Sequence, residues 1–432
     1  MSEPKVIISP ATPGYSVDGQ TLDILIRLQA PAAPEGGEAR RPPMHLALVI
    51  DRSGSMSGGP LREALKCAEH IVRRMRPADR VAVVAYDDEI LVPAPLAAVV
   101  NPDAIVASFA HLPAGGSTAL HAGWQRGVAE LKPLAAAGQL SRVVLLSDGE
   151  ANQGLTDPEA LAAEAKQETA AHVTTTTIGL GHNFNEVLMA AMADAGQGRH
   201  YYGQTAADLQ SAFEEEFALL EALHAREITL AFVPGPGVLL ELRSADGRAD
   251  APVALADLAY GAETWLFGRL HIAARRDSAS PLFSVAAHGT LRDGSTFATA
   301  PAMLVVPALS AADAQRLPRD EIVLQRGVEV EAGRLFRQAR AALAAGNRKA
   351  AREALTQVEA LAAANPWVAE ALLRLKRLIE HDEAMFMKES LHAHDRMSRR
   401  LSASDEAAYL GPVSESAKPA YLRRKPEQGK GS

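Results

Sequence analysis

Between Met44 and about His224, short apolar segments alternate with amphipathic or glycine-rich segments. The apolar segments have the length of strands, and they are His45–Ile50, Val81–Tyr86, Val143–Ser147 and Val173–Ile178. The segments that follow have the length and spacing of helices, and they are Pro60–Arg76, Thr118–Leu131, Pro158–Ala171, Asn185–Ala195 and Ala206–Leu223. Apolar strands that lack alternation and are separated by helices are typical of a parallel sheet covered on both faces. The pattern predicts an α/β fold with a doubly wound, mostly parallel sheet.

The segments on either side of this block read as strands. Thr21–Ala30 places apolar residues at nearly every second position, as in a strand with one buried face, and a Pro/Gly-rich connector follows it. From Glu227 to Val306, strand-like segments are separated by turn residues without a segment of helical length, which favours an antiparallel β-sandwich. The N-terminal strand needs partners, and we expect it to join this sandwich. The α/β block is then inserted in the sandwich; otherwise the sandwich only follows it.

Beyond about Asp320 the composition becomes rich in Ala, Leu, Arg and Glu. Breaks at Gly346-Asn347 and Asn365-Pro366 divide the part up to Arg400 into three predicted helices of a C-terminal α-helical domain. The last segment, Ser402–Ser432, has few large apolar residues, and we expect it to be disordered in isolation. The predicted parts are an N-terminal strand with a linker, the α/β domain, the β-sandwich, the helical domain and the tail, with bounds at 1–42, 43–225, 226–308, 309–400 and 401–432.

Charge and cysteine content exclude several classes of protein. Among 432 residues, 44 Lys and Arg stand against 52 Asp and Glu, a net charge of −8, whereas a nucleic-acid-binding domain has a basic excess. The single cysteine, Cys67, excludes a disulfide framework and a cysteine-rich zinc site, and its apolar neighbours predict a core residue. The sequence has no signal-peptide pattern and no run of about 18 apolar residues. We therefore expect a cytoplasmic chain that binds neither nucleic acid nor membrane.

The sequence LVIDRSGSMSGGP places polar chemistry at the end of the first predicted strand of the α/β block. Asp51, Ser53 and Ser55 stand two residues apart, just beyond the carboxyl edge of the sheet, where open α/β sheets bind ligands. Carboxylate and hydroxyl oxygens are hard ligands that suit Mg²⁺. Taken alone, these residue types are also typical of caps and turns before a helix.

Two later segments add to this cluster. Thr118 follows a Gly-Gly pair in AGGSTAL, and Asp148 follows an apolar strand in VVLLSDG, so both lie at the same predicted edge as Asp51. In this order, the residues resemble the metal-ion-dependent adhesion site of the von Willebrand factor A family, which is D-x-S-x-S followed by Thr and then Asp. The likeness covers about Met44–His224, and no position of the motif departs from it.

The resemblance implies a metal site and no catalytic residue. The expected ligands are Asp51, Ser53, Ser55, Thr118 and Asp148. The expected cofactor is Mg²⁺, with Mn²⁺ or Ca²⁺ as substitutes. The resemblance also places Asp87 near the site, either as a group that supports the ligands from behind or as the N-cap of a helix.

Three hydroxyls and at most one direct carboxylate leave the octahedral shell of Mg²⁺ incomplete. An Asp or Glu of a partner can complete it, so we expect a non-enzymatic adaptor or scaffold that binds a protein through Mg²⁺, with a nearby apolar rim adding affinity. The family likeness permits an AAA+ ATPase as that partner. The alternatives are a metal-dependent phosphohydrolase or a component of a protein-modification system, and a structural domain whose site is never occupied. Ser53 stands where phosphotransferases of the haloacid dehalogenase type need a second Asp, which counts against the hydrolase.

Three further features stay open. The family likeness implies that the last helix of the α/β block can shift with metal coordination, and only His224–Arg226 separate it from the next strand, so we expect metal occupancy to change the domain orientation. His381, His392 and His394 lie on a predicted helix without evident metal-binding partners, which favours a partner-facing helix. Arg423–Lys425 in the tail is either solvated or a short docking motif.

Overall fold

The computed structural model describes residues 2–34, 42–136, 139–181, 183–203, 205–243, 251–276, 279–363 and 365–398. Its α/β unit contains a six-stranded sheet in the order β6-β5-β4-β7-β8-β9. These strands are β4 (Met44–Asp51), β5 (Arg80–Tyr86), β6 (Ile90–Ala98), β7 (Leu140–Ser147), β8 (Val173–Leu180) and β9 (Gln197–Gly203). Neighbouring strands are parallel except β5 and β6. The predicted mostly parallel sheet is confirmed.

Helices cover both faces of this sheet because its central strands are apolar on both faces. One core contains Leu46 and Leu48 of β4, and the core on the opposite face contains Ala47 and Val49. The helices on the first face are α1 (Gly59–Arg74), α2 (Pro102–Phe109) and α6 (Ala206–Glu221). Those on the second face are α3 (Leu120–Leu131), α4 (Pro158–Ala170) and α5 (Glu186–Ala195). Cys67 is buried in α1, which confirms it as a core residue, and burial raises the pKa of its thiol to about 12.

The sequence pattern missed β6, β9 and α2. β6 and β9 are the two edge strands of the sheet, so each has a neighbour on one side only. Their sequences, ILVPAPLAA and QGRHYYG, contain prolines or polar residues instead of a continuous apolar run. Edge strands tolerate such residues because half of their backbone groups need no partner in the sheet.

The flanking strands form two antiparallel sheets that share one hydrophobic core. The first sheet has the order β1-β3-β14-β11, with β1 (Lys5–Pro10), β3 (Gln20–Gln29), β14 (Glu263–Ile272) and β11 (Val238–Leu242). The second has the order β12-β10-β15-β16, with β12 (Val253–Leu255), β10 (Leu223–Pro234), β15 (Phe283–Leu291) and β16 (Thr296–Ala298); β13 (Leu258–Ala259) pairs with β10, and β17 (Ala302–Leu304) pairs with β15. Strand β3 pairs with β14 along its whole length. The N-terminal strands therefore belong to the sandwich, and the α/β unit is inserted between β3 and β10.

The junction between the α/β unit and the sandwich is shorter than predicted. Helix α6 ends at Glu221 and β10 begins at Leu223, so Ala222 is the one residue between them, and the predicted linker His224–Arg226 lies within β10. A buried ion network crosses the same junction. The guanidinium of Arg142 in β7 donates to Glu216 of α6 at 2.8 Å and to Asp257, beside β13, at 2.5 Å. Whether metal binding changes the domain orientation stays a prediction.

The C-terminal part contains four long helices among the described residues, not the predicted three. They are α8 (Glu321–Ala344), α9 (Arg348–Ala362), α10 (Pro366–His381) and α11 (Glu383–Ser398), and the short helix α7 (Ala311–Ala314) precedes them. The missed break is at Asp382, whose side chain accepts a hydrogen bond from the backbone N–H of Met385 at 3.0 Å. An aspartate N-cap can start a new helix without glycine or proline, so the break left no strong signal in the sequence. The predicted disordered tail lies outside the described residues.

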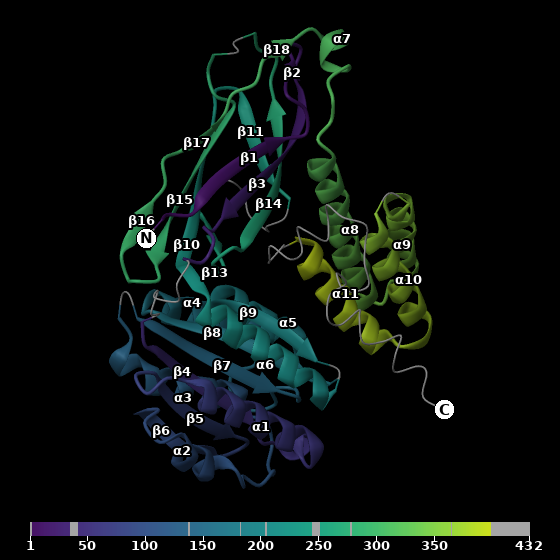
Figure 1. Ribbon diagram of the computed structural model, residues 1–432. Helices are drawn as coiled ribbons and strands as arrows, with labels where there is room; N and C mark the ends of the chain where they lie inside the picture. The colour runs from purple at the N-terminus through teal and green to yellow at the C-terminus, as the bar shows by residue number, and fades with distance from the viewer. Residues whose placement is uncertain are drawn as a thin grey trace.

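The three units lie next to one another. Figure 1 shows the α/β unit at one end of the sandwich and helices α8 to α11 along the side of the sandwich. Val323 and Val330 of α8 belong to the sandwich core. Helix α11 contacts the α/β unit, where Lys388 donates to the backbone oxygen of Phe184 at 3.1 Å. Within the described ranges, no helix is long and apolar enough to cross a bilayer.

Candidate metal site

The candidate site lies where β4 and β7 end side by side. Asp51 is the last residue of β4, and Ser147 and Asp148 stand at the end of the neighbouring parallel strand β7. Ser53 follows β4 and is the N-cap residue of a short 3₁₀ helix, η1 (Gly54–Met56), and Ser55 lies within that helix. Carboxyl ends of parallel strands meet at one edge of a sheet, which is why residues almost one hundred positions apart come together here.

Asp51 is fixed below the site by hydrogen bonds. One carboxylate oxygen accepts from the backbone N–H of Ser53 at 2.8 Å, and the other accepts from the hydroxyl of Ser147 at 2.7 Å. The side chain is fully buried. Burial raises the pKa of Asp51, and the hydrogen bonds from Ser53 and Ser147 oppose that shift. Ser147 was not predicted as a site residue, although it directly precedes Asp148 in the sequence.

The three hydroxyls of the motif surround one point. A methyl group added to Gly149 would lie 3.1 Å from Oγ1 of Thr118, 3.4 Å from Oγ of Ser55 and 3.9 Å from Oγ of Ser53. The hydroxyls of Ser53 and Ser55 are 3.2 Å apart, and Ser55 donates to the carboxylate of Asp148 at 2.6 Å. The space above Gly149 is therefore lined by hydroxyls, with two carboxylates beside it. The structure brings all five sequence-predicted residues together.

The donor set fits a hard divalent cation. Among the described residues, Asp51 and Asp148 have no Arg, Lys or His partner within ion-pair distance, although both are largely buried. Two buried carboxylates without a counter-charge are costly unless a cation neutralises them. Hydroxyl and carboxylate oxygens suit Mg²⁺, Mn²⁺ or Ca²⁺. In the part of the chain that the structure describes, no group of three or more His, Cys, Asp or Glu side chains forms a metal cluster of another kind.

Neighbouring loops hold this arrangement. The backbone N–H of Gly54 donates to the oxygen of Gly116 at 3.1 Å, and that of Gly115 donates to the oxygen of Arg52 at 2.8 Å. The backbone N–H of Thr118 donates to the side-chain oxygen of Asn152 at 2.9 Å. The loops after β4 and β7 are thus both bound to the segment that carries Thr118. The supporting role of Asn152 was not predicted, because a loop asparagine carries no distinctive signal.

Asp87 supports the site loop and does not cap a helix. It follows β5 and lies in the turn to the antiparallel strand β6, so no helix begins there. Its carboxylate accepts from the guanidinium of Arg52 at 2.7 Å and from the backbone N–H of Glu89 at 2.8 Å. Arg52 stands between Asp51 and Ser53 in the sequence. The N-cap interpretation is therefore wrong, and Asp87 instead orders the loop from behind.

The rim around the site is polar, contrary to the expected apolar rim. We define the site loops as residues 51–62, 86–90, 112–118 and 148–156. The large apolar side chains that are exposed in the described structure all lie outside these loops, and they are Val100, Leu134, Val187, Val233, Leu239, Met303, Val305 and Leu373. Ser55, in contrast, is exposed. The site opens to solvent on the side of Ser55 among polar groups.

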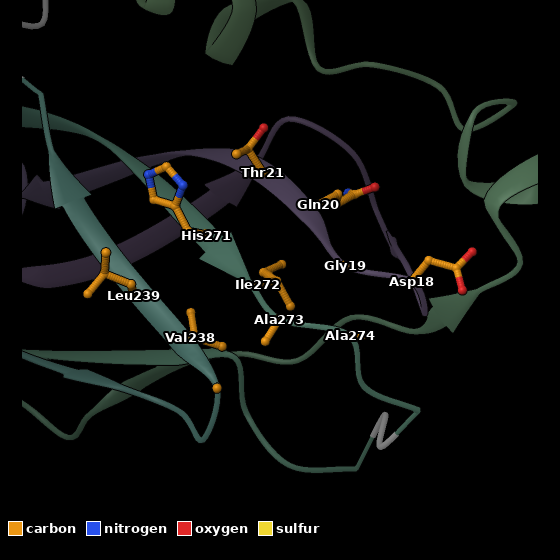
Figure 2. Close-up of a pocket in the computed structure, with 11 residues that line it drawn as sticks. Asp18, Gly19, Gln20, Thr21, Val238, Leu239, His271, Ile272, Ala273 and Ala274 are labelled. Carbon is orange, nitrogen blue, oxygen red and sulfur yellow. The ribbon is translucent and has the colours of Figure 1, made fainter.

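A second hollow lies on the sandwich, away from this edge. It is lined by the turn before β3, by the end of β14 and by the start of β11 (Figure 2). Its one imidazole, His271, is paired with Glu241 at 2.9 Å, and the side-chain oxygen of Gln20 accepts from the backbone N–H of Ser16. Its polar side chains do not converge on one point, so it offers no competing catalytic or metal site.

Acidification is expected to weaken cation binding at this site. Burial, together with the charge of Asp51, raises the pKa of Asp148 to about 6, and the hydrogen bond from Ser55 opposes the shift. Because a proton and a cation compete for that carboxylate, the dissociation constant for Mg²⁺ should rise about tenfold per pH unit below about pH 6. Calorimetric titrations between about pH 5 and about pH 8 measure it. A constant affinity across that range would contradict the assignment of Asp148 as a ligand.

Acidification should have the opposite effect on the stability of the metal-free protein, which it should increase. A carboxyl whose pKa is raised in the folded state binds its proton more tightly there than in the unfolded chain. The contribution of Asp148 to the free energy of unfolding therefore decreases as the pH rises from the usual pKa of an Asp carboxyl, 3.8, towards the raised pKa of about 6. Saturating Mg²⁺ should offset this decrease, which denaturation with and without the cation can measure.

Comparison with known proteins agrees with this fold. The family model of the von Willebrand factor type A domain matches residues 45–215. Two curated relatives are the uncharacterized protein YfbK of Escherichia coli, 28% identical over 207 residues (47% of this chain and 36% of that protein), and the uncharacterized protein sll0103 of Synechocystis, 31% identical over 191 residues (44% of each). The chain thus spans less than half the length of these relatives. A solved von Willebrand factor type A protein from Catenulispora acidiphila has a TM-score of 0.70 at 16% identity, covering 91% of this chain and 96% of that one.

The inserted α/β unit is therefore a von Willebrand factor type A domain. The family match lies within the unit that contains the six-stranded sheet, and the structural likeness shows the fold alone because its sequence identity is low. The five motif residues fall inside the matched range. The family match identifies the domain and does not show that these residues bind a metal.

Proposed function

We propose that this chain is a Mg²⁺-dependent protein-binding module that takes an Asp or Glu side chain of a partner at the candidate metal site. The observation that carries the proposal is the convergence of three hydroxyls on the space above Gly149, beside two buried carboxylates that have no cationic partner among the residues that the structure describes. Such a space is suited to a hard cation and has no evident structural use without one.

The five residues have different tasks in this proposal. Ser53, Ser55 and Thr118 supply neutral oxygens, and Asp51 and Asp148 supply the negative charge. The cation, when bound, supplies a Lewis-acidic position that attracts a carboxylate oxygen. Because Ser55 is exposed while Asp51 is buried, the solvent-facing side is where the partner's side chain would enter.

The proposal is non-enzymatic. Ser53 stands two residues after Asp51, where a phosphoryl-transferring aspartate pair would need its general acid. The hydroxyl of Ser55 is bonded to the carboxylate of Asp148, and no imidazole is bonded to it in the described structure. We accordingly propose a cytoplasmic adaptor or scaffold, with an AAA+ ATPase as one partner that the family likeness permits.

Affinity capture from native lysate tests this function. The full chain is used as bait with Mg²⁺, with EDTA, and as the Asp51→Ala/Ser53→Ala variant with Mg²⁺. The matched control variant is Glu353→Ala/Thr356→Ala, which changes a carboxylate and a hydroxyl on the exposed face of α9. We expect a set of proteins that is recovered with the wild-type chain and the control, and lost with EDTA and the site variant. Equal recovery in all four samples would contradict the proposal.

Calorimetry separates the proposal from a structural domain with a permanently empty site. Titration of the full chain with Mg²⁺ should give one binding event, and Mn²⁺ should give the same stoichiometry. The Asp51→Ala/Ser53→Ala variant should give none. Absence of binding to the wild-type chain for both cations would favour the purely structural reading.

A further inference from the structure

The site loops have a net negative charge that is larger than the charge of one divalent cation. Their carboxylates are Asp51, Asp87, Asp88, Glu89, Asp148 and Glu150, and their basic side chains are Arg52 and Arg62. Six carboxylates against two guanidinium groups leave four negative charges, and a divalent cation reduces these to two. The site loops would therefore keep a net negative charge after the cation has bound.

Half of these carboxylates form the outer rim. Asp88, Glu89 and Glu150 are exposed, and the side chain of Glu89 is 76% accessible. The carboxylate of Asp88 lies against Gly116 and leaves no room for a side chain there. Gly116 in turn accepts the backbone hydrogen bond of Gly54, beside Ser55. Glu150 stands two residues after Asp148. Glu150 thus shares a loop with the candidate ligand Asp148, whereas Asp88 and Glu89 lie in the β5–β6 turn, in which Asp88 packs against the segment that leads to Thr118.

Nearby basic groups neutralise this rim only in part. Arg52 is buried and donates to Asp87 at 2.7 Å, with Glu89 at 3.7 Å. Lys388 of α11 lies against the ring of Phe184 and 3.9 Å from Glu186, a carboxylate of the α/β unit. The charge of the rim carboxylate Glu150 also acts to raise the pKa of Lys388, so Lys388 partly offsets that one rim charge. Arg62 is exposed, and its guanidinium donates to the backbone oxygen of Gly58 at 3.2 Å.

A purely acidic partner segment would meet repulsion at this surface. The cation attracts one carboxylate at short range, whereas the rim acts on all the charges around that carboxylate. Like charges that face each other across an interface lower the affinity for a wrong partner. The described rim also lacks exposed large apolar side chains that could compensate by burial.

Building on the proposed function, we propose that the site selects peptide segments in which a single Asp or Glu is flanked by Lys or Arg. The carboxylate completes the metal shell, and the flanking cations pair with Asp88, Glu89 and Glu150. The chain itself contains a sequence of this chemistry, KPAYLRRKPEQGKGS at residues 418–432, in which Glu427 is the one acidic side chain among five basic ones. This sequence supplies a natural set of probes.

Three synthetic peptides with amidated C-termini, all based on residues 418–432, test the inference by fluorescence anisotropy with the full chain at saturating Mg²⁺. The first has the chain's own sequence, the second carries Glu427→Gln, and the third carries Arg423→Ala/Arg424→Ala/Lys425→Ala. We expect Mg²⁺-dependent binding of the first, and a loss of about tenfold or more in affinity for each of the other two. Added salt should weaken binding of the first peptide more than that of the third.

A protein variant tests the rim itself. Asp88→Asn/Glu89→Gln/Glu150→Gln removes three charges with little change of shape, and Glu353→Gln/Glu359→Gln, which removes two charges from the exposed face of α9, is the surface control. The rim variant should bind the first peptide about tenfold more weakly and lose the preference for it over the third. The control should bind as the wild-type chain does.

The outcomes distinguish this inference from the proposed function. Mg²⁺ binding by calorimetry is measured for each variant, so that peptide affinities are compared at full metal occupancy. If Mg²⁺ binds but the first and third peptides bind equally well, or the first does not bind at all, the inference is overturned and the metal site remains. If Mg²⁺ itself does not bind, the proposed function fails first.

Discussion

Replacing Arg142 by methionine is expected to lower the free energy of unfolding by about 3–5 kcal/mol, the range measured when one partner of a buried ion pair is removed. The substitution leaves the carboxylates of Glu216 and Asp257 buried without their ion-pair partner, although the charge of Arg226 still acts on Asp257. Urea denaturation at neutral pH measures the loss by linear extrapolation. Arg352→Met, at an exposed ion pair with Glu380 on the C-terminal helices, is the control and should change little. A loss of less than about 1 kcal/mol at Arg142 would contradict the assigned role.

The expected size of this effect follows from the surroundings of Arg142. Its side chain is fully buried, and it also donates to the hydroxyls of Thr174 at 2.9 Å and Thr176 at 3.4 Å. Burial acts to lower the pKa of Arg142, but the charges of Asp257 and Glu216 outweigh burial and raise it, so the group stays charged. Because Arg142 lies on β7 and its partners lie on β8, on α6 and beside β13, the network joins the type A domain to the sandwich.

Replacing Gly149 by alanine is expected to weaken Mg²⁺ binding by about 10–100-fold without removing any ligand, the range found when groups around a metal site are changed. The added methyl group would lie 3.1 Å from Oγ1 of Thr118 and 3.4 Å from Oγ of Ser55, in the space that the three hydroxyls enclose. Mg²⁺ tolerates little distortion, because it needs near-octahedral ligands at short distance.

Gly59→Ala is the matched control, since a methyl group there would meet no atom within 4 Å. Calorimetric titration with Mg²⁺ should show the loss for Gly149→Ala and an unchanged affinity for Gly59→Ala. Thermal unfolding of both variants without metal shows whether the fold is intact. An unchanged affinity for Gly149→Ala would mean that the cation, if it binds, does not occupy this space.

The central sheet could be predicted because its strands are buried on both faces. Val81–Tyr86 and Val143–Ser147 are continuous apolar runs, and the observed β5 and β7 extend them by only a few residues. The edge strands β6 and β9 could not be predicted in this way, because half-exposed strands have no continuous apolar run. The five motif residues were predictable for a related reason, because their positions relative to those strands place them at one edge.

The supporting groups of the site and the junction could not be predicted from the sequence. Arg142 follows Ser141 in what reads as the polar start of a strand, and its partners lie 74 and 115 residues away. The pair of Arg52 with Asp87 depends on the register of β4 against β5. A single sequence contains the residues of such long-range pairs without stating which of them meet.

Anomalous diffraction from a crystal of the chain soaked in Mn²⁺ tests the central claim most directly. Mn²⁺ prefers the same hard oxygen ligands as Mg²⁺ and gives a measurable anomalous signal. The account predicts one strong peak above Gly149, within coordination distance of the hydroxyls of Ser53, Ser55 and Thr118. A fully soaked crystal with no peak at that position would contradict it.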